Sequence, residues 1–358
     1  MKKLTKMMLA ALMAASVAAC SSGGEPAPAD DGGETKPIVL KMANSNSTAM
    51  WEDTELNLMV AEKYFIEELP KRTEGRYEIQ IFLDNQLASG TNAQIQGLKS
   101  GAFDICELGT GSMGAFTDAY TELIVPYMFQ NQDVVDLVLA GDVGKDMMAR
   151  SAEDIGGVIP LFYADNGFRV LTHREKLIKT PDDLKGVKIR VQEDPIMILT
   201  FETLGCSVTS VPFSELFTAL QQRLVDAEEN PYTNIYNQKY YEVQKTATET
   251  NHMFTAFVYY INADVFNNMS EADQQAVMEL AAECQAMRAE KMKEVTASYM
   301  ERLKAEGMEI YTPTPDELRL FQEKMVDNVW PEIEAKIGED RWNALLDAVK
   351  AAEAELGL

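Results

Sequence analysis

Two arginines stand in apolar stretches that have the pattern of β-strands. Arg190 lies within VKIRV at 187–191, and Arg169 lies within NGFRVL at 166–171. A guanidinium in such a setting is costly unless it meets an anion, and its planar fork matches a carboxylate through two parallel hydrogen bonds. The two residues therefore predict a site for an organic acid. The alternative is that each arginine pairs with an internal Asp or Glu.

Catalytic motifs are hard to find in the chain. It has two histidines, His173 and His252, and no HExxH, GxSxG or Gly-rich lysine loop. The neighbours Glu228 and Glu229 could serve acid–base chemistry, but adjacent carboxylates are expected among 57 acidic residues, and we expect these two to be solvated. No Cys or His spacing suggests zinc, and no catalytic residue or cofactor is predicted. A binding protein is favoured, and an enzyme acting on a carboxylated substrate is the alternative.

The motif GTGSMG at 109–114 matches GxGxxG and follows a predicted strand. A dinucleotide-binding loop would then need a long helix and an acidic residue about twenty positions further on. The chain instead runs through FTDAY at 116–120 to Pro126 without a clear amphipathic pattern. We interpret the motif as a flexible loop at a strand end that lines a cleft.

The elements around these residues alternate between strand and helix patterns. In the first half, strands are expected at 37–43, 76–83 and 103–108, and helices at 54–72 and 92–100. In the second half, strands are expected at 187–191 and 225–228, and helices at 196–204 and 215–224, the last capped by Ser214. Such alternation indicates parallel sheets with crossover helices.

One internal similarity favours two related lobes. The segments LKSGAFD at 98–104 and LQQRLVD at 220–226 both run from a helix end through a tight turn into a strand. The repeat rests on three like positions, so chance agreement is the alternative.

The C-terminal third has a helical pattern. Ser270 is a predicted N-cap with Asp273 three residues later, an approximate capping box, and Gly307 stops the apolar periodicity. About 36 residues at 1.5 Å each give roughly 54 Å, longer than one lobe of this size. We expect one helix that braces both lobes, and the alternative is two helices with a break.

The start of the chain indicates the compartment. A basic segment precedes an apolar run at 7–17, which is too short for a bilayer that needs about 20 residues. The run ends in VAAC at 17–20, which resembles the bacterial lipoprotein signal. We therefore expect a signal peptide at 1–19 and acylation of Cys20, with an ordinary signal peptide as the alternative. The expected location is extracytoplasmic, in the periplasm or at the cell surface.

The segment that follows is expected to be a tether. Residues 20–36 are rich in Gly, Pro, Ser and acidic side chains and have little apolar surface to bury. No later stretch approaches about 18 uninterrupted apolar residues. The lipid anchor is thus the only expected attachment to the membrane.

Charge and cysteine content disfavour two further classes. Without the three lysines of the signal peptide, the chain has 29 basic and 57 acidic residues, a net charge of −28. This balance repels phosphate backbones and argues against nucleic-acid binding, and most of it is interpreted as a solvated surface. Cys106, Cys206 and Cys284 are odd in number and widely spaced, which is not a disulfide framework. Cys106 and Cys284 lie among apolar residues and are expected to be buried thiols.

The segment 188–245 resembles the solute-binding subunits of TRAP (tripartite ATP-independent periplasmic) transporters, which include the C4-dicarboxylate binders of the DctP family. The residues that carry the resemblance are KIRV at 188–191, TLG at 203–205, PFSELFTALQ at 212–221, VDAEENP at 225–231 and YYEVQK at 240–245. GFRVLT at 167–172 and LKSGAFD at 98–104 fit the same pattern, within a similarity over 38–345. The chain departs from the family at Ala227-Glu228, where Gly-Gln is usual, and at Arg223, where Gly is frequent.

The resemblance implies a periplasmic-binding-protein-like α/β fold. Its two α/β lobes enclose a ligand cleft and are joined by crossing hinge strands and a long spanning helix. The expected lobes are 37–166 with part of 254–295, and 167–253 with part of 296–358. The implied partners are a small organic acid and the ion-driven membrane subunits of a TRAP transporter.

The resemblance also implies roles for individual residues. Arg190 would make the bidentate carboxylate contact and Arg169 a second cationic contact, while Asn230 would add a polar contact and Phe213 would pack on the ligand. Asn44, which follows the first strand, is expected to contribute a polar contact from the other lobe. Glu107 and Asn92 are weaker candidates.

Overall fold

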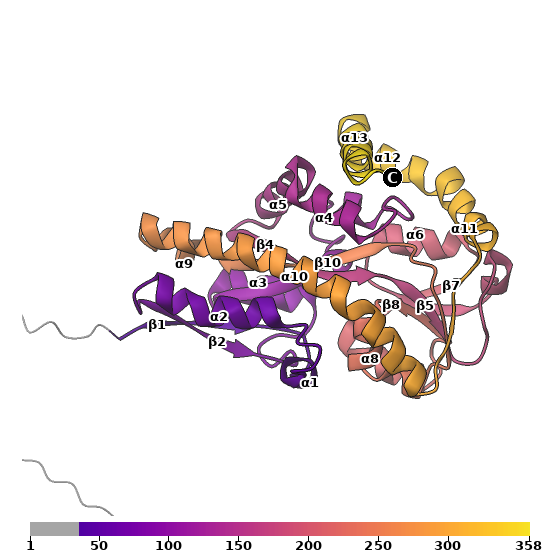
Figure 1. Cartoon of the computed structure of the whole chain (residues 1–358), viewed down its shortest axis with the longest axis horizontal. Helices are drawn as coiled ribbons and strands as arrows, with labels where there is room; N and C mark the ends of the chain where they lie inside the picture. The colour runs from indigo at the N-terminus through magenta and orange to yellow at the C-terminus, as the bar shows by residue number, and fades with distance from the viewer. Residues whose placement is uncertain (1–35) are drawn as a thin grey trace, which may run out of the picture. The chain divides into compact units, whose positions relative to one another are not determined.

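Two mixed β-sheets carry the fold in the computed structural model, which describes residues 36–358 (Figure 1). The first sheet has the strand order β2-β1-β3-β10-β4. Its strands are β1 (Ile38–Ala43), β2 (Tyr77–Phe82), β3 (Ile105–Gly109), β4 (Val158–Phe168) and β10 (Phe254–Asn262). β1 pairs in parallel with β2 and β3, whereas β10 runs antiparallel to β3 and β4.

The second sheet has the order β11-β9-β5-β8-β6-β7. Its strands are β5 (Val170–His173), β6 (Lys188–Val191), β7 (Ser207–Ser210), β8 (Ala227–Asn230), β9 (Thr246–Thr248) and β11 (Glu309–Tyr311). β6 pairs in parallel with β7 and β8, and β5 runs antiparallel to β8 and β9. The expected two-lobe α/β class is thereby confirmed, with antiparallel strands that the sequence patterns did not predict.

Helices pack against both sheets and between them. Those before the second sheet are α1 (Thr48–Glu52), α2 (Val60–Arg72), α3 (Thr91–Ser100), α4 (Gln132–Ala140) and α5 (Asp142–Ile155). Those within the second sheet's segment are α6 (Pro195–Thr203), α7 (Leu216–Gln221) and α8 (Tyr232–Asn237). The remaining helices are α9 (Ala263–Asn267), α10 (Glu271–Ala305), α11 (Pro315–Asn328), α12 (Trp330–Ile337) and α13 (Glu339–Leu356). Short 3-10 turns occur at η1 (Thr110–Ser112), η2 (Thr121–Ile124), η3 (Pro181–Leu184), η4 (Phe213–Glu215) and η5 (Tyr240–Glu242).

The chain first passes from the first sheet to the second through a one-residue connection. β4 of the first sheet ends at Phe168 and β5 of the second begins at Val170, so Arg169 is the junction. β10 returns the chain to the first sheet. The C-terminal helices contact elements of both sheets, α13 against α4 and α11 against α6. The exact division into lobes by residue number stays a prediction.

The long helix is present as one element. α10 runs for 35 residues, and its N-cap Ser270 accepts a hydrogen bond from the backbone of Asp273. Val277, Leu280 and Cys284 pack into the core of the first sheet, whereas Met292, Val295 and Tyr299 pack into a cluster of the second. Figure 1 shows this helix in orange crossing from one sheet to the other. The expectation of an unbroken helix that braces both lobes is confirmed.

Two predicted helix starts are wrong. The expected helix at 54–72 begins at Val60, because Asp53 Oδ1 accepts the backbone N–H groups of Glu55 and Leu56 in a separate turn, and Asn57 has a positive φ of 48°. Ser214 does not cap the helix at 215–224. It lies inside η4, and α7 begins at Leu216 without a side-chain cap.

The internal similarity of 98–104 and 220–226 is a shared backbone turn. Gly101 ends α3 in the left-handed region at φ 72°, and Arg223 occupies the equivalent place after α7 at φ 60°. The following residues, Ala102 and Leu224, donate matching backbone hydrogen bonds of 2.9 Å to Gly97 and Ala219. Both turns need positive φ, which glycine adopts without the cost paid by other residues.

This turn gives a prediction for stability. Arg223→Gly should raise the free energy of unfolding by about 1 kcal/mol, because a left-handed residue with a Cβ costs roughly 1–2 kcal/mol. Gly101→Ala is the matched control and should lower it by a similar amount, since open space surrounds its Cβ position and only backbone strain changes. Urea unfolding with an unchanged m value measures both. A loss of stability in Arg223→Gly would contradict the argument.

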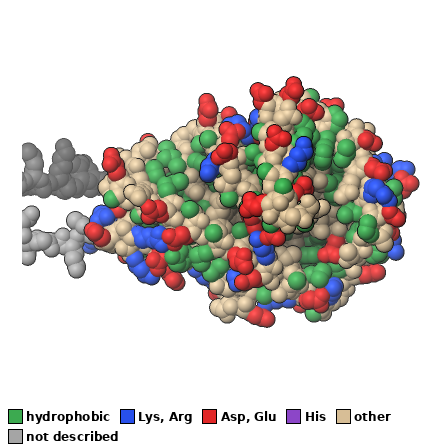
Figure 2. All heavy atoms as spheres, turned by 45° about the horizontal axis from the view of Figure 1, so that its top comes forward, with side chains coloured by type: hydrophobic (Ala, Val, Ile, Leu, Met, Phe, Trp, Pro, Cys, Tyr) green, Lys and Arg blue, Asp and Glu red, His purple; other side chains and the backbone are tan. Residues whose placement is uncertain are grey.

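The remaining sequence expectations divide between surface and interior. Asp and Glu side chains are spread over the face in Figure 2 among Lys, Arg and neutral groups. Cys106 and Cys284 are buried free thiols as expected, and Cys206 is half-buried. The signal peptide at 1–19, Cys20 and the tether up to residue 35 lie outside the described residues. Among residues 36–358, no helix has the length and apolarity needed to cross a membrane.

Candidate functional site

A cavity of about 330 Å³ lies where the parallel strands of both sheets end. From the first sheet it is lined by residues that follow β1, β2 and β3, and from the second by residues at the ends of β6, β7 and β8. Ligands in open α/β sheets bind at the carboxyl ends of strands, and the volume suits a small molecule. The strands that connect the sheets add Asn166, Thr255 and Phe257. The site is therefore assembled from both lobes.

Arg190 is the cation of this cavity. It is 2% exposed, and burial lowers the pKa of its guanidinium. Nε and Nη2 both donate to the carbonyl oxygen of Val211, at 3.0 and 2.8 Å. Nη1 is buried and has no hydrogen-bond partner within residues 36–358. The Nε–Nη2 edge of the guanidinium is thus bound to a neutral carbonyl. The N–H groups of the Nη1–Nη2 edge can donate to an anion, whose charge would be balanced by that of Arg190.

Two predicted site residues lie in the same cavity lining. Asn230 is at the end of β8, and its Oδ1 accepts hydrogen bonds from Arg169 Nη2 and Asn234 Nδ2 at 3.1 and 3.2 Å. Its Nδ2 donates to Glu228 at 2.6 Å, and the second N–H of the amide has no partner in the described range 36–358. Phe213 is half-buried and stands edge-on to Tyr240, with ring centroids 6.3 Å apart. The structure therefore brings Arg190, Asn230 and Phe213 together.

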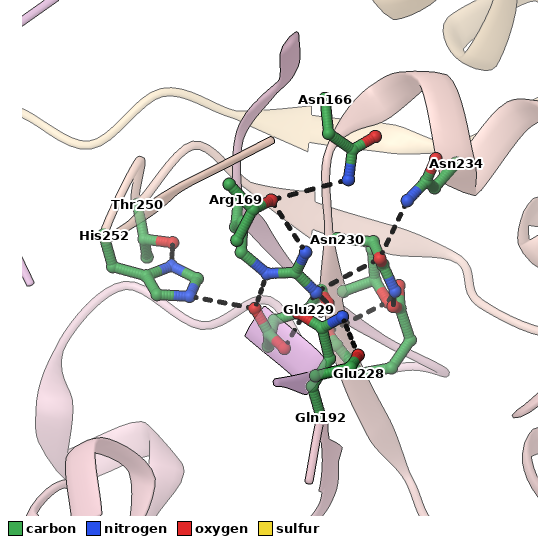
Figure 3. Close-up of polar contacts among 12 residues, drawn as sticks. Asn166, Arg169, Gln192, Glu228, Glu229, Asn230, Asn234, Thr250 and His252 are labelled. Atoms are coloured by element: carbon green, nitrogen blue, oxygen red, sulfur yellow. Dashed lines mark hydrogen bonds and ion pairs between the residues drawn. The ribbon is translucent and has the colours of Figure 1, made fainter. Parts of the chain in front are cut away.

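Arg169 lies one layer behind the cavity. Its side chain is fully buried and forms a two-point ion pair with Glu229, which also accepts a hydrogen bond from His252 (Figure 3). Arg169 Nη1 donates to Thr255 Oγ1 at 3.3 Å and Nη2 to Asn230, so it touches two residues of the lining. Its direct contact with a ligand stays a prediction. The geometry supports a positioning role at least as well.

The pair Glu228 and Glu229 is buried, and the expectation that it is solvated is wrong. Both side chains have no exposure, because β8 is covered on both faces. Burial alone would raise the pKa of Glu229, but Arg169 and the hydrogen bond from His252 hold it below its ordinary value. Glu228 has no ion pair among residues 36–358. Hydrogen bonds from Thr172 and Asn230 and the charge of Arg169 offset burial only in part, and burial raises its pKa to about 7. Neither carboxylate belongs to the cavity lining.

Glu228 gives a prediction for pH dependence. The folded protein holds a proton on Glu228 up to about pH 7, whereas the unfolded chain releases it near 4.5. The folded state binds more protons in this window, so the free energy of unfolding falls as pH rises from 4.5 to 7. Glu228→Gln removes this loss, because the amide oxygen keeps the acceptor for Asn230. The amide N–H can donate to Thr172 Oγ1, whose own hydrogen then goes to Gln244 Oε1 instead of to residue 228.

Urea unfolding at several pH values measures the effect. Relative to the parent, Glu228→Gln should gain stability progressively between pH 4.5 and 7 and level off above 7, at a few kcal/mol in order of magnitude. The difference between the two proteins isolates Glu228 from the other buried acids. A difference that does not change with pH would show that Glu228 is already ionised in the folded state.

The opposite wall of the cavity is neutral at its surface. Ser45 and Asn92 belong to the lining, whereas Asn44 and Glu107 do not. Asn44 is 1% exposed, and its amide is used by Tyr259 Oη and by the backbone N–H of Asn46, both at 2.8 Å. The contact of Asn44 with a ligand stays a prediction. A contact from the neighbouring Ser45 is favoured more, because Ser45 belongs to the cavity lining.

Glu107 stands behind this wall. Oε1 accepts from both the backbone N–H and the hydroxyl of Ser45, each at 2.5 Å, while Oε2 is buried and has no partner in the described part of the chain. Burial raises the pKa of Glu107 to about 8. The carboxyl group thus fixes Ser45 rather than facing the cavity itself.

The GTGSMG loop lies between the lobes, as predicted for a strand-end loop that lines a cleft. Gly109 to Ser112 belong to the lining. A Cβ on Gly111 would meet Gln192 Oε1 at 2.3 Å, and one on Gly114 would meet Asp194 Oδ2 at 2.1 Å. Gln192 Nε2 donates to Ser112 Oγ at 2.9 Å across the cavity. The glycines are needed for this close approach of the two lobes.

The lining residues that were missed from the sequence include Ser45, Asn166, Gln192 and Asn234. A signal existed for Gln192, since residues two apart on a strand share a face and Arg190 precedes it by two. Asn234 follows Asn230 by four residues and is brought back to it by the first turn of α8. Ser45 and Asn166 carry no local signal, because distant strands place them.

Comparison with known proteins gives a consistent result. The model of the family described as bacterial extracellular solute-binding protein, family 7 (DctP), matches residues 49–336. The chain is 32% identical to the 2,3-diketo-L-gulonate-binding periplasmic protein YiaO of Escherichia coli (strain K12) over 253 residues, 71% of this chain and 76% of that protein. It is 27% identical to the C4-dicarboxylate-binding periplasmic protein DctP of Rhodobacter capsulatus over 353 residues, 98% of this chain and all of that protein.

A solved structure matches the fold. The sugar acid binding protein DctPAm from Advenella mimigardefordensis strain DPN7T, in complex with galactonate, superimposes with a TM-score of 0.81 at 28% identity. The match covers 88% of this chain and 99% of that one.

Proposed function

Because the chain belongs to family 7 of the bacterial extracellular solute-binding proteins, we propose that it captures a small organic acid through Arg190 and delivers it to the membrane subunits of a TRAP transporter. The observation that carries the proposal is the free edge of the Arg190 guanidinium, buried in a cavity of about 330 Å³. A buried cation without an anion is costly in the empty protein. A carboxylate that reaches it removes this cost.

The contact is bidentate in the proposed complex. Val211 uses Nε and one N–H of Nη2, so the second N–H of Nη2 and one N–H of Nη1 point along parallel directions. Asn230 has a further N–H available beside them. The relatives' names are in keeping with this, since they specify acids: a diketogulonate, C4-dicarboxylates and galactonate.

A thermal-shift screen against a library of organic acids tests the capture. An acid at 100 times its Kd should stabilise the protein by about 2.7 kcal/mol, and the acid should be recovered unchanged. Absence of a shift with every carboxylate would overturn the proposal. Conversion to a product would instead support the enzyme alternative, which the burial of Glu228 and Glu229 away from the cavity lining disfavours.

Delivery to a membrane partner is the second part of the proposal. A ligand held by residues of both lobes stabilises the closed arrangement, so the surface formed jointly by the lobes differs between loaded and empty protein. Uptake into vesicles that hold the cognate TRAP subunits should require this protein and a sodium or proton gradient, and should persist without ATP. Uptake that follows ATP would contradict this transporter class.

Acylation of Cys20 is the third part of the proposal. It rests on VAAC at 17–20 and would keep the protein at the outer side of a membrane. Cys20→Ser removes the thiol that carries the lipid and should shift the protein from the detergent phase to the aqueous phase. Identical partitioning of the two proteins would contradict the anchor.

A further inference from the structure

We propose that the acid is a polyhydroxy monocarboxylate, with its carboxylate on Arg190 and its hydroxyl groups on the wall formed by the first lobe. This inference rests on the proposed function and specifies the class of ligand. A dicarboxylate of the same length is the competing class. Three observations separate the two.

The first observation is the distribution of charge. Arg190 is the only cationic side chain that lines the cavity in the described part of the chain, and Glu193 is the only acidic one. Glu107 lies directly behind Ser45. A second carboxylate at the far wall would therefore lose its water without gaining a cation.

The second observation is the hydrogen-bond polarity of Ser45. Its backbone N–H and its hydroxyl hydrogen both go to Glu107 Oε1. The Ser45 oxygen therefore offers only lone pairs to the cavity. A ligand hydroxyl can donate to these lone pairs, whereas a carboxylate has only lone pairs of its own.

The third observation is an unused acceptor at Gln192. Its Nε2 is directed to Ser112 Oγ, and its Oε1 is buried beside Gly111 without a partner among residues 36–358. A buried acceptor needs a donor. A ligand hydroxyl supplies one, and an ionised carboxylate does not. Gln192 belongs to the second lobe but reaches the first-lobe wall through Ser112. The polar groups of that wall, such as Asn92 and Thr91, are also neutral.

Titration calorimetry on the complete protein, with acids of matched length, tests the inference. The six-carbon set is D-gluconate, D-galactonate, hexanoate and adipate, and the four-carbon set is D-erythronate, L-threonate, butyrate and succinate. We expect at least one hydroxy acid to bind about a hundredfold more tightly than the dicarboxylate and the unsubstituted acid of its length. Tightest binding of succinate or adipate would overturn the inference and leave the proposed function intact. Binding of none of the eight would count against both.

Ser45→Ala tests the hydroxyl wall directly. It should weaken the hydroxy acid about tenfold, because one hydrogen bond is lost, and leave hexanoate or butyrate unaffected. The backbone N–H of residue 45 still reaches Glu107, so the loop keeps that contact. Ser100→Ala, at an exposed position outside the cavity, is the matched control and should change neither affinity. An equal loss for hydroxylated and unsubstituted acids in Ser45→Ala would contradict the assignment.

Discussion

Arg190→Ala is expected to weaken the binding of an organic acid by roughly 3–5 kcal/mol, which is about a hundredfold or more in Kd. The loss is large because the ligand carboxylate would be desolvated beside Asn230 and Phe213 without a cation. The ligand-free variant should keep its stability within about 1 kcal/mol. The guanidinium has no ion pair within residues 36–358, and Val211, whose carbonyl it releases, belongs to the cavity lining. Calorimetry and urea unfolding measure the two quantities.

Two further variants sharpen this test. Arg190→Lys should also bind poorly, because one ammonium cannot hold the Val211 carbonyl and grip a carboxylate at two points. Arg319→Ala removes an exposed cation that forms an ion pair with Asp316 on α11, far from the cavity lining in sequence, and it should leave affinity unchanged. Near-parental affinity in Arg190→Ala would refute the site.

Arg169→Met, unlike Arg190→Ala, is expected to act mainly on stability, with a loss of roughly 3–5 kcal/mol in the free energy of unfolding. The variant leaves Glu229 fully buried with only the neutral donor His252, whose pKa is lowered by burial. It also removes the donor that orients Asn230. The measurement is urea unfolding of the ligand-free protein.

A double variant checks the cause. Arg169→Met with Glu229→Leu removes both charges and should recover a substantial part of the stability, as a coupled pair does in a double-mutant cycle. Loss of affinity with full stability in Arg169→Met would instead show that Arg169 contacts the ligand, as the family resemblance implies. The two arginines are thus distinguished by their expected effects: loss of Arg190 lowers ligand affinity, and loss of Arg169 lowers the free energy of unfolding.

Local patterns predicted the elements that depend on neighbouring residues. α10 was visible from Ser270, Asp273 and Gly307, because caps and periodicity act within a few positions. The start of α2 was missed, since the competing turn depends on the side chain of Asp53 and the positive φ of Asn57. The antiparallel pairing of β10 was also missed, because register between distant strands leaves no mark in either strand alone.

The candidate site was likewise predictable only where it depends on residues close together in the sequence. The apolar neighbours of Arg190 predicted a buried guanidinium, and it is buried. The burial of Glu229 was not predictable, because its partner Arg169 is 60 residues away. The same holds for Ser45, which Glu107 orients from 62 residues away. Long-range pairing decides which polar groups face the cavity.

The long helix makes the two lobes a mechanical system. α10 is anchored at Cys284 in the first core and at Met292 in the second, and between them Arg288 donates to the backbone oxygens of Asp165 and Leu58. Because α10 is fixed in both cores, a rotation of one lobe against the other would have to bend the helix between Cys284 and Met292. An opening of the proposed trap would therefore store elastic energy in α10, and this energy would oppose wide separation of the lobes.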